Sequence, residues 1–88
     1  MKQALGIFEV RSMLAAVQAA DAMVKAASVK IVDFHFVGSG IVSVVVEGEV
    51  AAVKAAVENA MASAGHLAEV ISTNVIPRPH DEVSKILK

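Results

Sequence analysis

The apolar and polar positions of this chain follow the strand period of two in some stretches and the helical period of 3.6 in others. Residues 3–10, QALGIFEV, predict a first strand, in which Gly6 indicates a bend or a close backbone approach. Residues 12–27 follow the helical period, and Ser12 is a suitable N-cap for that helix. Its apolar stripe consists of Met13, Val17, Ala20 and Val24. Its polar stripe consists of Arg11, Gln18, Asp21 and Lys25.

Residues 29–47 predict a β-hairpin, and the rest of the chain is arranged around this stretch. Two runs rich in Val, Ile and Phe, which strands prefer, flank Gly38-Ser39-Gly40. These three residues tolerate positive φ, so they predict a tight turn with little side-chain bulk at its tip. In the second run both faces are at least partly apolar, and we therefore expect both faces of that strand to be covered.

The second half of the chain predicts another helix and another strand. Residues 49–65 follow the helical period, with acid in the first turn and Gly65 just past the end. The predicted core stripe of this helix consists of Val50, Val53, Val57 and either Ala60 or Met61. Residues 69–76 alternate as a strand, which Pro77 ends. Asp81 is a candidate cap for a short C-terminal helix with the apolar residues Val83, Ile86 and Leu87.

The predicted order is strand, helix, strand, strand, helix, strand, followed by a short C-terminal helix. This order predicts an α+β fold of the ferredoxin-like, split βαβ class, with an antiparallel sheet and two helices on one of its faces. We expect residues 1–88 to form a single domain. Because many activities share this fold, the fold by itself indicates no function.

The composition predicts an oligomer. Apolar residues make up 56% of the chain and the mean hydropathy is +0.63, which is high for a domain with so much surface per unit volume. The longest charge-free run, residues 34–46, is shorter than the roughly 20 residues of a membrane-spanning helix. We therefore expect no membrane partner, and a net charge of −1 argues against a nucleic-acid partner. The remaining way to bury the apolar surplus is association with other protein chains.

The residues that carry chemistry form no catalytic or metal-binding pattern. The chain has no Cys, which excludes disulfides and thiolate metal sites. His35, His66 and His80 are far apart in the sequence and lack metal-ligand spacing. Gly38-Ser39-Gly40 is too short for a nucleotide-binding loop. We expect no metal, no cofactor, no catalytic residue and no enzymatic activity.

Three stretches together point to one protein family. They are DAMVKAA at residues 21–27, Gly38-Ser39-Gly40 with its flanking strands, and VIPRPH at residues 75–80. In this order and at these separations, they resemble the single-domain, hexamer-forming shell proteins of bacterial microcompartments. The resemblance covers essentially the whole chain.

The resemblance implies a homohexamer that tiles edge to edge into the facets of a shell in the bacterial cytoplasm. Neighbouring hexamers, other shell proteins and the enclosed enzymes would be its partners. Six copies of Gly38, Ser39 and Gly40 would ring a central pore that passes small polar metabolites. The hexamer-edge contacts that the family pattern implies are Lys25, Ser28, Arg78 and His80.

Two positions bear on the type of compartment and on its permeant. Ile41 stands where many carbon-fixing relatives have a basic residue, which favours a catabolic compartment over a carboxysome. Phe36 stands at a position that is commonly polar, so the identity of the permeant stays open. Two other classes also stay open, namely an oligomeric small-molecule-sensing regulatory domain and a small enzyme of acylphosphatase-like layout. Oligomer size distinguishes the three classes.

Overall fold

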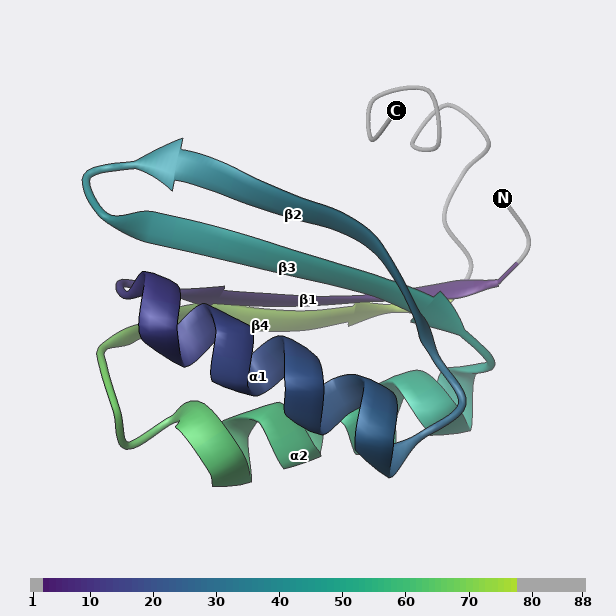
Figure 1. Cartoon of the computed structure of the whole chain (residues 1–88). Helices are drawn as coiled ribbons and strands as arrows, with labels where there is room; N and C mark the ends of the chain where they lie inside the picture. Colours follow the sequence, from purple (N-terminus) through teal and green to yellow (C-terminus); the bar gives the residue numbers. More distant parts are fainter. Residues whose placement is uncertain (1–2, 78–88) are drawn as a thin grey trace.

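The structure, a computed structural model, describes residues 3–77 as a four-stranded sheet with two helices packed on one face (Figure 1). The elements in chain order are β1 (Ala4–Val10), α1 (Met13–Ala26), β2 (Lys30–Gly38), β3 (Ile41–Gly48), α2 (Val50–Ala64) and β4 (Val70–Ile76). The strand order is β2-β3-β1-β4, and every neighbouring pair is antiparallel. The predicted split βαβ arrangement is therefore confirmed. The predicted C-terminal helix lies outside the described residues.

Both helices pack on the same face of the sheet, and the order of the strands places each helix under a different half of that face. The connections from β1 through α1 to β2, and from β3 through α2 to β4, each cross over one strand. As a result, β2 and β4 are the two edge strands, and β3 and β1 form the centre. Figure 1 shows α1 and α2 side by side beneath this sheet, with the β2–β3 hairpin projecting at one end.

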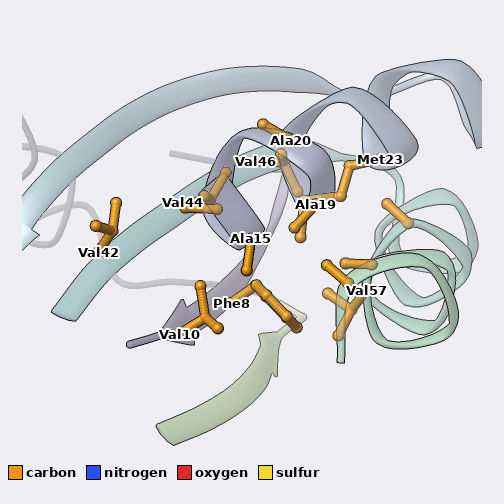
Figure 2. Close-up of a cluster of buried hydrophobic side chains, with 14 residues drawn as sticks. Phe8, Val10, Ala15, Ala19, Ala20, Met23, Val42, Val44, Val46 and Val57 are labelled. Carbon is orange, nitrogen blue, oxygen red and sulfur yellow. The ribbon is translucent and has the colours of Figure 1, made fainter. Parts of the chain in front are cut away.

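The core lies between the central strands and the facing sides of the two helices (Figure 2). Phe8 and Val10 of β1 and Val44 and Val46 of β3 are fully buried there. β3 is buried on both faces, as its apolar alternation predicted, since Val45 on the opposite face is also buried.

Small residues form most of the helical side of the core. The buried residues of α1 are Ala15, Ala16, Ala19, Ala20 and Met23. The buried residues of α2 are Val53, Ala56, Val57, Ala60 and Ala64. Alanine brings a helix backbone close to its neighbours, which suits two helices packed side by side against a short sheet.

The apolar stripe that the sequence predicts on α1 is not the side of the helix that is buried. Of the predicted apolar stripe only Ala20 is buried, while Met13, Val17 and Val24 are exposed. These three apolar residues do lie on one side of the helix, but that side is next to the alanine face that contacts the core. In α2, Val53 and Val57 are buried as predicted, and the alternative Ala60 or Met61 resolves in favour of Ala60.

The ends of the helices agree with the sequence in part. The Ser12 side chain accepts a hydrogen bond of 3.1 Å from the backbone N–H of Ala15, which confirms Ser12 as the N-cap of α1. Glu49 occupies the N-cap position of α2 without a side-chain cap bond, so the first turn itself contains no acid. Gly65, predicted just past the end of this helix, directly follows Ala64 as the C-cap of α2 and has a right-handed conformation.

Candidate assembly surfaces and hairpin tip

Gly38, Ser39 and Gly40 form the tip of the β2–β3 hairpin, as predicted. All three have positive φ, with values of 129°, 54° and 80°. β2 ends at Gly38 and β3 begins at Ile41, so Ser39 and Gly40 are the two central residues of the turn. Positive φ at both central positions is the feature that lets a two-residue turn match the twist of a hairpin. The tip is exposed, and its two glycines leave bare backbone there.

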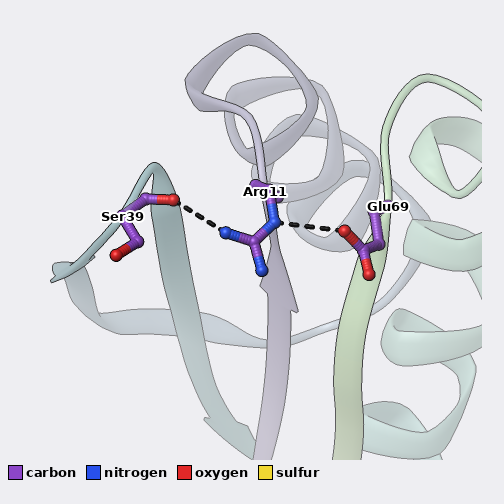
Figure 3. Close-up of polar contacts among 3 residues, drawn as sticks. All are labelled: Arg11, Ser39 and Glu69. Carbon is purple, nitrogen blue, oxygen red and sulfur yellow. Dashed lines mark hydrogen bonds and ion pairs between the residues drawn. The ribbon is translucent and has the colours of Figure 1, made fainter.

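Arg11 connects this tip to the rest of the subunit (Figure 3). Its Nη1 donates a hydrogen bond of 2.9 Å to the carbonyl oxygen of Ser39, and its Nε donates one of 3.1 Å to Oε1 of Glu69. The backbone N–H of Arg11 also donates to the backbone carbonyl of Glu69 at 2.9 Å. The end of β1, the hairpin tip and the segment entering β4 therefore meet at one side chain.

Lys25 and Ser28 lie at the opposite end of the subunit from the tip. Lys25 is in the last turn of α1, and its Nζ lies 3.0 Å from Oδ2 of Asp21. Ser28 is exposed just after α1 and lines a hollow of about 370 Å³, together with Gln3, Gly48, Glu49 and Ala52. The 14 residues of α1 span about 20 Å, which separates this end from Arg11 and the tip.

The other two predicted edge residues, Arg78 and His80, lie outside the described residues. The structure follows the chain only to Pro77, directly after β4. The structure therefore brings Lys25 and Ser28 to one end of the molecule, and it leaves the predicted contacts of Arg78 and His80 as expectations.

A first group of exposed apolar side chains, which we name the β2 flank, runs along the β2 edge. Gln18 of α1 hydrogen-bonds Ser63 of α2, which fixes the side of α1 that faces α2. By the helical period, Met13, Val17 and Val24 are on the other side of α1, toward β2. Five residues make up the β2 flank: Met13, Val17 and Val24 of α1, and Ile31 and Phe36 of β2.

The residues of β2 in this flank lie on the same face of the sheet as the helices. Ile31 pairs with Val46 and Phe36 with Val42, and both valines belong to the core. Phe36 contacts Phe34 edge-on, with ring centroids 6.2 Å apart, yet remains 62% exposed. A large aromatic side chain so exposed, on the same edge of the subunit as three exposed apolar helix residues, is typical of a surface that binds protein.

A second group of exposed apolar side chains, the β4 flank, lies at the other edge of the sheet. It consists of Met61 of α2, Leu67 of the following loop and Ile71 of β4. Ser63 marks the side of α2 that faces α1, and Met61 lies on a different side by the helical period. The subunit thus carries two different apolar flanks on opposite edges.

The part of the chain that the structure describes contains no group of three or more His, Cys, Asp or Glu side chains that could hold a metal ion. Neither α1 nor α2 has the length and hydropathy of a membrane span. His35 is exposed on β2, on the opposite sheet face from Phe34, and lies directly across from Ser43 of β3. The candidate functional site therefore consists of the exposed apolar flanks and the backbone turn at the hairpin tip.

The fold and these surfaces coincide with a known family. The model of the BMC domain matches residues 4–79. The chain belongs to the BMC domain family of bacterial microcompartment shell proteins. This family consists of structural shell proteins rather than enzymes, which agrees with the expectation from the sequence.

Relatives of this family match nearly the whole chain. It is 50% identical over 86 residues to the bacterial microcompartment shell protein PduA of Citrobacter freundii, covering 98% of this chain and 92% of that one. It is 44% identical over 84 residues to EutM of Salmonella typhimurium, covering 96% and 88%. It is 45% identical over 89 residues to the carboxysome shell protein CcmK2 of Thermosynechococcus vestitus, covering 99% and 87%.

A solved structure shows the same fold. The crystal structure of a microcompartments protein from Desulfitobacterium hafniense DCB matches with a TM-score of 0.87 at 32% identity. The match covers 99% of this chain and 47% of that one, so this chain spans about half the length of that protein. The agreement between fold and family places the hairpin and both helices in a common BMC architecture.

Sequence reasoning missed the contact between Arg11 and Glu69 and the role of the apolar stripe on α1. Arg11 and Glu69 are 58 residues apart, and no local pattern pairs them. For the stripe a signal was present, since Ala15, Ala16 and Ala19 form an unbroken small-residue face on the same helix. Two apolar sides on one helix indicate that the helix packs against two different neighbours.

Proposed function

We propose that this chain forms a closed hexamer that tiles into the facets of a microcompartment shell and passes small polar metabolites through its centre. One arrangement of surfaces supports this proposal. The hairpin tip lies at one end of the subunit, Lys25 and Ser28 lie at the other, and an apolar flank follows each edge of the sheet between them. A subunit with an inner end, an outer end and two lateral flanks has the layout of one sector of a ring.

The two flanks differ in residues and in the elements that carry them, so they favour a heterologous contact. In such a contact the β2 flank of one subunit packs on the β4 flank of the next, and the ring closes when the rotation between neighbours divides a full turn. Each subunit then buries both flanks, which accounts for the apolar surplus of the chain. The resemblance to hexamer-forming shell proteins supports six as the number of subunits.

The outer end of the sector is the proposed contact between hexamers. Lys25 is highly exposed at the end of α1, and Ser28 lines the neighbouring hollow. We propose that these residues, with Arg78 and His80, form the contact with the adjoining tile. Other shell proteins of the same compartment would dock through the same rim, and enclosed enzymes would contact a face of the tile.

The inner end is the proposed pore. Six copies of the tip would surround the axis with backbone groups and the hydroxyls of Ser39. These groups replace part of the water that a polar solute loses in a narrow passage, whereas an apolar solute gains nothing from them. The two glycines leave room because a side chain at either position would point into a crowded ring.

We also propose a catabolic compartment rather than a carboxysome. The identity to PduA is 50%, compared with 45% to the carboxysome protein CcmK2. Ile41, directly after the tip, lacks the positive charge that many carbon-fixing relatives carry there. A small monomeric enzyme, one of the two alternatives from the sequence, would have no need of two apolar flanks along opposite edges, and the number of subunits distinguishes a hexameric tile from an oligomeric sensing domain.

The experiment for assembly is light scattering of the gel-filtered protein, followed by electron microscopy. The expected results are a hexamer in solution and flat sheets or tubes on the grid. A stable monomer at micromolar concentration would contradict the proposal.

The experiment for transport uses Ser39→Leu. Six leucines at the axis should narrow and dry the pore, while the flanks and the rim stay unchanged. We expect intact compartments with this variant in their facets to consume substrate more slowly than wild type, and broken compartments to consume it equally fast. If the intact variant shells match wild type with other pore proteins absent, the hairpin tip is not the conduit.

A further inference from the structure

Outside its own hairpin, the tip is hydrogen-bonded to the rest of the subunit by one described side chain. β1 last pairs with β3 at Val10 and Val42, so the tip extends beyond the central ladder. A Cβ atom placed on Gly38 would meet nothing within 4 Å, which shows how open this region is. Among the described residues, Arg11 is the one side chain that hydrogen-bonds the tip.

Arg11 supports the tip through its stem as well as its head group. Its Cγ would lie 3.7 Å from a Cβ on Gly40, which is ordinary van der Waals contact. The stem therefore passes beneath Gly40 while the guanidinium reaches the carbonyl of Ser39. A planar guanidinium can hold two acceptors in fixed directions, whereas an ammonium group is a point charge on a flexible stem.

Glu69 fixes the guanidinium from the other side. Its carboxylate accepts from Nε of Arg11, and its backbone carbonyl accepts from the backbone N–H of the same residue. Arg11 is thus tied at its backbone and at its head group to the segment that enters β4. Figure 3 shows Arg11 between the other two residues, with one dashed contact to each.

We propose that Arg11, oriented by Glu69, is the positioning residue that holds the hairpin tip in one conformation and thereby fixes the aperture of the pore. This inference rests on the proposed pore for its functional part and on the described contacts for its structural part. Two of the three tip residues are glycines, whose backbone has more freedom than that of other residues, so a charge-assisted bond to the carbonyl of Ser39 is an important restraint on the tip.

The first test is hydrogen exchange of the assembled full-length protein, measured by mass spectrometry over residues 37–42. Arg11→Met keeps an apolar stem under Gly40 and removes the guanidinium. We expect exchange at the tip to be about tenfold faster, the effect of losing a hydrogen bond to a charged group. Exchange in residues 4–10 should stay unchanged. Equal exchange at the tip in variant and wild type overturns the proposal, as does faster exchange in both segments.

Three further variants separate positioning from charge and from overall stability. Arg11→Lys keeps the charge but cannot hold both acceptors, so it should give intermediate exchange at the tip. Glu69→Gln keeps an acceptor oxygen and should also be intermediate. Asp21→Asn breaks an exposed ion pair of similar length at the far end of the subunit and should leave the tip unchanged. A tip that responds equally to Asp21→Asn overturns the local role of Arg11.

The second test is uptake of a small and a bulkier polar solute by intact shells. A loosened tip should reduce the discrimination between the two solutes in Arg11→Met shells and restore part of it in Arg11→Lys shells. Faster tip exchange without any change in discrimination supports the positioning role and overturns the proposed pore. Unchanged tip exchange overturns the positioning role whatever the uptake shows. The two proposals therefore fail in different ways.

Discussion

At the scale of single residues, Gly6 sets how closely α2 approaches the sheet. A Cβ at this position would lie 2.6 Å from Cγ1 of Val53, closer than real Cβ atoms come to other atoms, and 3.0 Å from Cγ2 of Val57, which is tighter than most real contacts. Both valines are β-branched and rotate with difficulty, so relief requires movement of the helix. The absence of a side chain in the middle of β1 thus allows the tight packing of the layers.

We predict that Gly6→Ala lowers the free energy of unfolding by about 1–3 kcal/mol through overpacking. Urea unfolding, followed by circular dichroism at a fixed protein concentration, measures this change in the free energy of unfolding. The control is the double variant with Val53→Ala, which removes the nearest clashing atom. Its total destabilisation should be smaller than the sum of the two single effects. Additive effects would show that the contact with Val53 is not the cause.

At the scale of elements, α1 has three distinct sides. Its alanine face contacts the core, Met13, Val17 and Val24 belong to the β2 flank, and Leu14 points outward with 74% exposure. The core face follows from the small volume of alanine, which lets α1 and α2 lie close together. The larger apolar residues then occupy the side of the helix where a neighbouring subunit supplies the missing contacts.

We predict that Val17→Glu prevents ring formation, whereas Leu14→Glu does not. An unpaired carboxylate buried in the contact costs about 3–5 kcal/mol, so the dissociation constant of that contact should rise by at least about 100-fold. Both residues are exposed in the subunit and share one helix. Neither substitution weakens the helix appreciably, because glutamate is about as good a helix former as leucine and a better one than valine. Light scattering at micromolar concentration measures the outcome. If the Val17→Glu variant still forms a hexamer, the apolar stripe of α1 does not lie in the contact between subunits.

At the scale of the whole molecule, two different flanks make assembly directional. A head-to-tail contact gives every subunit one donor flank and one acceptor flank, whereas an isologous contact uses the same flank twice. The distinction can be tested with two variants that each spoil one flank. Val17 represents the β2 flank and Met61 the β4 flank, and both lie at exposed helix positions.

We predict that Val17→Glu and Met61→Glu are each monomeric alone and form a dimer when mixed. The intact β4 flank of the first variant then binds the intact β2 flank of the second, and the two remaining flanks are both spoiled. Analytical ultracentrifugation of the equimolar mixture measures this stoichiometry. A dimer formed by either variant alone would indicate an isologous contact, and a hexamer from the mixture would contradict both assignments.

The outer end of the subunit gives a second prediction about the whole molecule. Lys25→Asp should leave hexamers intact but stop their growth into sheets, because Lys25 lies at the end of α1 and, by the helical period, on a different side of the helix from Val24 of the β2 flank. A small, partly hydrated rim contact loses much of its strength with one charge-assisted bond. Asp21→Asn, which breaks the ion pair but keeps Lys25, is the control and should still form sheets. Light scattering and electron microscopy separate the two levels, and dissociation of the Lys25→Asp hexamer would contradict this placement.

The sequence by itself determined the features that depend on local backbone sterics and on periodicity. The hairpin turn at Gly38-Ser39-Gly40 and the N-cap at Ser12 were predicted, and the order of elements led to the correct sheet class. For Gly6 the sequence predicted either a bend or a close approach, and the structure has the close approach. Such features need only the residues concerned and their near neighbours, because the allowed φ and ψ of each residue limit the local chain path.

Only the tertiary structure decided which apolar side of α1 faces the core. Both sides have the helical period, and which of them is buried depends on how closely α1 can approach α2 and the sheet. The small side chains of the alanine face permit a close approach, whereas Met13 and Val17 would keep the helix farther away. The structure also brought Arg11 to Glu69 across 58 residues and to the hairpin tip. Contacts between residues so far apart in the sequence depend on the order of the strands in the sheet. The periodicity of a single segment does not predict that order.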